Sequence, residues 1–246
     1  MKIDKNQFAE LNRSTGIRHA QQFKFLADDL QKQGIDVASL VDQLSDFQVA
    51  IPSWALGAGG TRFGRFSFPG EPASLEQKIE DVGVLHALTH SAGAISLHIP
   101  WDIPQDYTAI RALAQEHDLI FDALNSNTFQ DQKGAAKSYK FGSLSDVEKT
   151  VRDQAIEHNH TVIDIGTQLG SNSLTVWLAD GADFPGQTNF QTALENTQDS
   201  LQKIYKHLPD DWKMFIEYKP YEPHFYSTVI QDWGTSLMLA NACGEK

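Results

Sequence analysis

The sequence predicts an α/β fold and, within that class, a (β/α)8 barrel of which about the first five βα units are present. Short apolar segments alternate with amphipathic helical segments, as is typical of a parallel sheet covered by helices. An aromatic or charged residue follows each predicted strand, where barrel enzymes place their chemistry. A doubly wound sheet would show the same alternation, but no strand is followed by a GxGxxG or GxxxxGK[ST] phosphate loop.

The first predicted element is a helical extension over residues 1–46. Apolar residues beginning with Phe8 recur every three or four positions, and Gly34 offers a stop within the helical stretch 5–48. No internal repeat or Pro/Ser-rich linker indicates a second domain. We therefore expect a single domain over 1–246, in which the extension precedes a partial barrel over 47–246.

Five strands follow from short apolar runs that end at polar, aromatic or proline residues. They are predicted at 47–51, 94–99, 118–124, 174–178 and 214–218. The helices are predicted from Ser74 onward and over about 106–117, 145–158, 188–208 and 234–243. Ser74 with Gln77, and Ser145 with Glu148, have the spacing of a capping box.

Five units cannot close an eight-stranded barrel, and an open parallel sheet would leave an unpaired edge. The length of 246 residues is itself typical of one complete barrel, so length and strand number disagree. We therefore expect the chain to be the N-terminal part of a longer protein.

Charge and composition exclude several classes of protein. With 20 Lys and Arg against 32 Asp and Glu, the net charge is −12, which disfavours nucleic acid and anionic membranes as partners. The one cysteine, Cys243, cannot form an internal disulfide and is expected to be structural. No signal peptide or apolar stretch of about 18 residues is visible. These features predict a soluble, cytoplasmic protein.

The segment around Glu217 and Lys219 contains the densest group of reactive side chains. The two residues are two apart on a predicted strand, so their side chains project from the same face. One interpretation is a salt bridge at a strand end. The other is a carboxylate metal ligand beside a lysine that polarises a substrate oxygen.

His98 and four large aromatic residues lie on or just beyond the predicted strands. A strand histidine can be a core residue, but His98 is followed by Trp101 near the expected barrel mouth. Trp54, Phe129 and Trp177 hold similar positions on three other strands. Together they are better explained by an apolar-walled pocket for sugar rings or methyl groups than as separate core residues.

Two further features receive simpler interpretations. The loop around Gly57–Gly60 lacks the lysine of a phosphate-binding loop, and its aromatics, Phe63, Phe66 and Phe68, suggest a contact between subunits. His158 and His160 are expected to follow a helix and to be solvated.

The motifs taken together resemble those of one known family. They are IPSWALGAGGTRFGRF at 51–66, SLHIPWD at 96–102, LTVWL at 174–178 with FPG at 184–186, and FIEYKP at 215–220 with IQDWG at 230–234. From about residue 47 onward the chain resembles the bacterial L-rhamnose isomerases of the broad-specificity type, which are xylose isomerase-like TIM barrels.

That resemblance implies a sugar isomerase of rhamnose catabolism that interconverts L-rhamnose and L-rhamnulose with two divalent metal ions, typically Mn²⁺. Glu217 resembles the carboxylate that bridges the metals, and Lys219 the lysine near the substrate O1. His98 resembles a histidine that contacts sugar hydroxyls. The pocket walls would be Trp54, Trp101, Phe129 and Trp177, and Phe63 resembles an aromatic that reaches a neighbouring subunit's site.

The family is tetrameric and takes its other metal ligands, Asp and His, from later strands, which would lie beyond residue 246. A single carboxylate cannot hold two cations. We therefore expect this chain alone to be inactive and poorly folded, and tight stoichiometric Mn²⁺ binding would contradict that expectation.

Three alternatives to the isomerase stay open. A ketose 3-epimerase on the same barrel predicts proton exchange at C3. A non-catalytic carbohydrate-binding protein predicts sugar binding without metal, although a neutral sugar gives such a protein little use for both Glu217 and Lys219. A structural remnant with an exposed sheet edge is the third. The preferred sugar, whether rhamnose, lyxose, mannose or allose, is also open.

Overall fold

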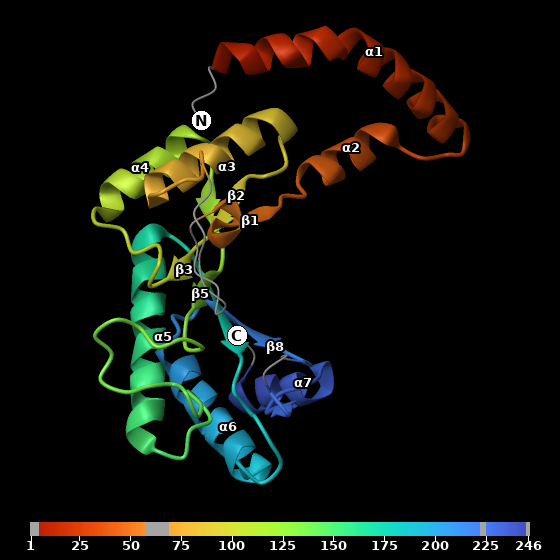
Figure 1. Cartoon of the computed structure of the whole chain (residues 1–246). Helices are drawn as coiled ribbons and strands as arrows, with labels where there is room; N and C mark the ends of the chain where they lie inside the picture. Colours follow the sequence, from red (N-terminus) through yellow and green to blue (C-terminus); the bar gives the residue numbers. More distant parts are fainter. Residues whose placement is uncertain (1–4, 58–68, 222–224, 245–246) are drawn as a thin grey trace.

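The computed structural model describes residues 5–57, 69–221 and 225–244, and its parallel strands follow one another in chain order (Figure 1). One sheet contains, side by side, β1 (Ala50–Pro52), β2 (Ala94–Ser96) and β4 (Ile120–Phe121). The other contains, in order, β3 (His98–Ile99), β5 (Leu124–Ser126), β6 (Ser173–Leu178) and β8 (Lys213–Tyr218).

The two sheets are successive parts of the same strands. β3 continues β2 after Leu97, and β5 continues β4 after Asp122 and Ala123. Within the described residues, five chain segments therefore lie next to one another, each parallel to the one before it. This order has no reversal, which a doubly wound sheet requires. The predicted α/β class with parallel strands is confirmed.

Helices connect the strands. They are α3 (Leu75–Thr89), α4 (Tyr107–Glu116), α5 (Lys149–Leu169), α6 (Phe190–His207) and α7 (Trp233–Cys243). A 3-10 helix, η1 (Ser53–Leu56), follows β1, and the short strands β7 (Gly181–Ala182) and β9 (Ser227–Thr228) pair antiparallel. In the described part of the chain, no helix is both long enough and apolar enough to cross a membrane.

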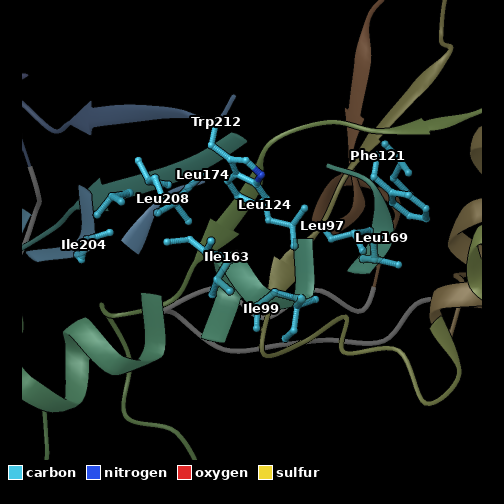
Figure 2. Packing of buried hydrophobic residues seen from close by; sticks show 14 of the residues in the cluster. Leu97, Ile99, Phe121, Leu124, Ile163, Leu169, Leu174, Ile204, Leu208 and Trp212 are labelled. Carbon is cyan, nitrogen blue, oxygen red and sulfur yellow. The ribbon is translucent and has the colours of Figure 1, made fainter. Parts of the chain in front are cut away.

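The core lies between the strands and the helices that cover one face of them (Figure 2). Leu97, Ile99, Leu124 and Leu174 are fully buried. They pack with residues of α5 and α6 and of the segment after α6, namely Ile163, Leu169, Ile204, Leu208 and Trp212. Because side chains alternate along a strand, this leaves His98, Asn125 and Thr175 for the opposite face.

Two helices, α1 (Lys5–Lys32) and α2 (Val37–Ser45), precede the sheet and extend from it (Figure 1). The predicted stop at Gly34 is confirmed, since Gly34 adopts a positive φ of 82° between them. Phe8 is buried and lines a pocket with Gly83 and His117. Other apolar side chains of α1 are exposed: Leu11, Ile17, Phe23, Phe25 and Leu26.

Several predicted boundaries differ from the structure. The capping box at Ser74 is confirmed, because Ser74 accepts a hydrogen bond from the Gln77 amide. The predicted cap at Ser145 is wrong, since its hydroxyl donates to Asp180 at 2.7 Å, and α5 begins only at Lys149. The first strand begins at Ala50 rather than at residue 47.

Candidate functional site

The candidate site lies on the strand face that points away from the helices. His98 on β3 pairs with Asn125 on β5, and Asn125 pairs with Thr175 on β6. Two residues further along, Trp177 pairs with Glu217 on β8. Residues in register project from the same face, so His98, Trp177 and Glu217 share it, together with Lys219.

Three aromatic rings surround the imidazole of His98. Trp101 stacks on it with a centroid distance of 3.9 Å. Trp54 and Phe129 contact it edge-on at 5.3 Å and 5.8 Å. Such stacked and edge-to-face arrangements are the favoured geometries of aromatic pairs. The segments following three neighbouring strands therefore meet at one histidine.

The cluster continues across β6 to β8. Phe129 contacts Trp177 at a centroid distance of 4.5 Å, and Lys219 Nζ lies 4.9 Å from the Trp177 ring centroid, a cation–π distance. Glu217 is next to Trp177 in the strand register. The structure thus brings together seven of the eight predicted site residues, and Phe63 lies outside the described residues.

A buried carboxylate that the sequence analysis did not single out supports one end of this cluster. Asp102 accepts hydrogen bonds from Ser53 Oγ at 2.5 Å, Lys78 Nζ at 2.6 Å and the His98 amide at 2.9 Å. Asp102 and Lys78 are 2% and 5% exposed. The sequence could have indicated Asp102, because this residue ends the SLHIPWD motif. Nothing in the sequence pattern of α3 distinguishes Lys78 from a surface lysine.

Burial keeps the His98 imidazole neutral. Its pKa is lowered from 6.5 to about 4, chiefly by removal from solvent; Asp102 opposes this shift, and the nearby His158 and Lys78 contribute to it. Among the described residues, the buried His98 Nδ1 has no hydrogen-bond partner. A neutral imidazole with a free ring nitrogen is suited to exchange hydrogen bonds with hydroxyl groups.

The prediction that His158 and His160 follow a helix and are solvated is wrong. Both lie within α5, which extends to Leu169. His158 Nε2 accepts a hydrogen bond from the Asn127 amide at 3.1 Å, and burial lowers the pKa of this imidazole. His160 stacks on His207 of α6 with ring centroids 4.1 Å apart. The i, i+7 spacing of the buried Ala155 and Val162 could have shown that the helix continues.

Glu217 on β8 and Lys219 just beyond its end are more exposed than His98. Partial desolvation raises the pKa of Glu217, and attraction to Lys219 acts against that rise. Within the described ranges, no group of three or more His, Cys, Asp or Glu side chains is placed to hold a metal ion. These residues therefore do not by themselves form a metal site, and Glu217 supplies one carboxylate.

Comparison with known proteins gives two kinds of similarity. No protein-family model matches the sequence. The chain is 49% identical over 226 residues to a probable sugar isomerase from Rhizobium meliloti, which covers 92% of this chain and 53% of that protein. It is 47% identical to a probable sugar isomerase from Mesorhizobium japonicum, covering 92% of this chain and 52% of that protein. The chain thus spans about half the length of the curated relatives it matches.

Solved structures give the fold. An L-ribulose 3-epimerase superimposes with a TM-score of 0.55 and 13% identity, covering 81% of this chain and 58% of that one. A D-allulose 3-epimerase from Methylomonas sp. gives 0.52 and 14%, covering 80% and 59%. Sequence identities of 13% and 14% support a shared fold but not a shared activity. The chain is therefore similar in sequence to two probable sugar isomerases, and its α/β fold is similar to that of these two solved 3-epimerases.

Proposed function

We propose that the protein acts as a metal-dependent aldose–ketose isomerase that converts L-rhamnose to L-rhamnulose by moving hydrogen between C1 and C2. The observation that carries this proposal is the continuous cluster from Trp54 to Lys219 at the carboxyl ends of consecutive parallel strands. The similarity to two probable sugar isomerases supports the sugar isomerase class.

Each residue of the cluster has a role that its chemistry suits. Lys219 places a cation where the substrate O1 would develop negative charge, and Trp177 supports that cation. The neutral His98 exchanges hydrogen bonds with sugar hydroxyls. Trp54, Trp101 and Phe129 exclude water and offer apolar surface to the C–H groups and the methyl group of a 6-deoxy sugar.

The proposal includes two divalent metal ions, Mn²⁺ in the first instance, with Glu217 as a shared ligand. Bound metal ions would polarise the sugar oxygens. The remaining ligands would come from outside the described residues, in keeping with the greater length of the curated relatives. A cytoplasmic homo-oligomer, with Phe63 contributing to a neighbouring subunit's site, is part of the same proposal.

The test compares the 246-residue chain with the protein encoded by the whole reading frame. Each is incubated with L-rhamnose and Mn²⁺, and ketose formation is followed. We expect the longer protein to form L-rhamnulose and the K219M variant to lose about 10²- to 10³-fold in turnover, because a charge-stabilising group is gone. Lys213 lies at the other end of β8 and is exposed, so K213M is the matched control. If the longer protein forms no ketose from any of the four candidate aldoses, the proposal is wrong.

A ketose 3-epimerase is the second candidate, because the fold matches 3-epimerases. The two reactions differ in the carbon that exchanges hydrogen. In D₂O, an epimerase introduces deuterium at C3 of a ketose, whereas an isomerase leaves C3 unlabelled. Sugar binding that persists without metal, with no turnover, would instead indicate the non-catalytic binding protein.

A further inference from the structure

We propose that Lys78 of α3 is a positioning residue, which acts through Asp102 to hold Trp54, His98 and Trp101 in their mutual arrangement. The kind of reaction that this arrangement assists rests on the proposed function. The arrangement itself does not depend on that proposal, because it follows from contacts between described residues.

One carboxylate is linked to the three chain segments that carry these rings. Asp102 directly follows Trp101 in the chain. It binds the hydroxyl of Ser53, the residue before Trp54, and it binds the His98 amide through the same oxygen, Oδ2. The remaining oxygen, Oδ1, accepts from Lys78 Nζ at 2.6 Å. Each ring is therefore attached to a backbone segment that Asp102 holds.

The energetics of this network indicate a role beyond stability. Both charged side chains are nearly inaccessible to solvent, and the desolvation of two ions offsets most of their attraction. An apolar pair of similar volume would stabilise a core at least as well. What an apolar pair lacks is direction, whereas the hydrogen bonds of Asp102 are directional and connect η1 and the start of β3 to α3. We infer that the network is retained for this geometry.

Lys78 belongs to a different layer from the site. It projects from α3, so it links the helix layer to the strand ends. The charged and titratable groups that act on His98 are Asp102, Lys78 of α3 and His158 of α5. Changing Lys78 or Asp102 thus alters both the position of the His98 ring and the charge that it experiences.

The experiment uses ¹³Cε1-histidine NMR of the protein, with His98 assigned through H98F. The principal variant is K78M/D102N, which removes both charges at nearly constant volume and keeps an acceptor at position 102. We expect this variant to retain its far-UV circular dichroism. It should lose the ring-current shift that Trp101 imposes on His98, and kcat/KM for the isomerase reaction should fall by about 10²-fold, the cost of a misplacement of about 1 Å.

The two single variants should shift the pKa of His98 in opposite directions, which provides a second measurement. K78M removes a neighbouring cation and should raise the pKa of His98, whereas D102N removes an anion and should lower it. K78R retains the cation and should keep the wild-type spectrum. If K78M does not fold, the double variant and D102N still decide the question.

Two matched controls separate this role from general stabilisation. K149M breaks an exposed ion pair with Asp153 on α5, and S200A removes a buried hydroxyl bonded to the Leu144 carbonyl. Neither should move the His98 resonance. An unchanged His98 shift and pKa in K78M/D102N would overturn the proposal, even if the protein became less stable. Absence of isomerase activity in the wild type would refute the proposed function but leave the NMR result decisive for Lys78.

Discussion

Acidification should destabilise the protein through His98 by an amount that follows from its burial. Burial lowers the pKa of this imidazole to about 4 in the folded protein, against 6.5 for an unperturbed histidine. One pKa unit corresponds to about 1.4 kcal/mol, so the full difference is about 3.5 kcal/mol. At pH 5 only part of this stabilisation has been lost, and the free energy of unfolding is about 2 kcal/mol lower than at pH 7.

The direction follows from which state binds the proton first. Because the folded pKa is lowered, the unfolded chain takes up a proton near pH 6.5 while the folded protein does not. The stabilisation is complete above that pH and is lost as the pH falls from about 6.5 to about 4. His158 has its pKa lowered by burial too, so it adds a contribution of the same sign.

The measurement compares wild type with H98F by urea unfolding at pH 7 and pH 5, followed by tryptophan fluorescence. Phenylalanine retains a ring against Trp101 but does not titrate, so other groups contribute equally to both proteins. We expect the free energy of unfolding of the wild type to fall by about 2 kcal/mol more than that of H98F. Equal falls in the two proteins, or an NMR pKa of His98 near 6.5, would refute the reasoning.

Three further substitutions test the packing and the hydrogen bonds behind the site. D180N weakens the four hydrogen bonds that Asp180 accepts from Ser143 and Ser145, and thermal unfolding should show a loss of about 2–3 kcal/mol. G166A would bring a Cβ to 2.6 Å from the Trp212 ring, so we expect a loss of about 1–3 kcal/mol and a changed near-UV circular dichroism spectrum. L124A should cost about 2–5 kcal/mol in urea unfolding, whereas the exposed L44A should stay within about 0.5 kcal/mol. A wild-type denaturation midpoint in L124A would contradict the described core.

The parallel α/β architecture was predictable because its signals are local. Alternating apolar periodicity, the Gly34 stop and the Ser74 cap each depend on a few neighbouring residues, and each is present in the structure. Ser145 shows the limit of such signals. Its spacing to Glu148 matches a capping box, yet its hydroxyl donates a hydrogen bond to Asp180, which is distant in the sequence. A pattern of two residues cannot reveal competition from a side chain 35 positions away.

The site was predictable to the extent that its residues follow strands. Trp54, His98, Phe129 and Trp177 lie near successive strand ends, and parallel strands bring such ends together. Lys78 and His158 were missed because both come from helices and reach the strand ends across the layer boundary. Their helical spacing describes which face they occupy, but it does not identify the buried polar group they meet.

Because each of the five parallel segments pairs with the parallel segment before it, the sheet can assemble in the order in which it is synthesised. The segment that leaves the ribosome always finds its pairing edge already formed. Ser173 of β6 pairs with Lys213 of β8, only 40 residues later. At a synthesis rate of about 5–20 residues per second, β6 would wait roughly 2–8 s for its neighbour. Each newly added parallel strand covers the edge that the strand before it exposed, and short sequence separations between pairing partners favour fast closure.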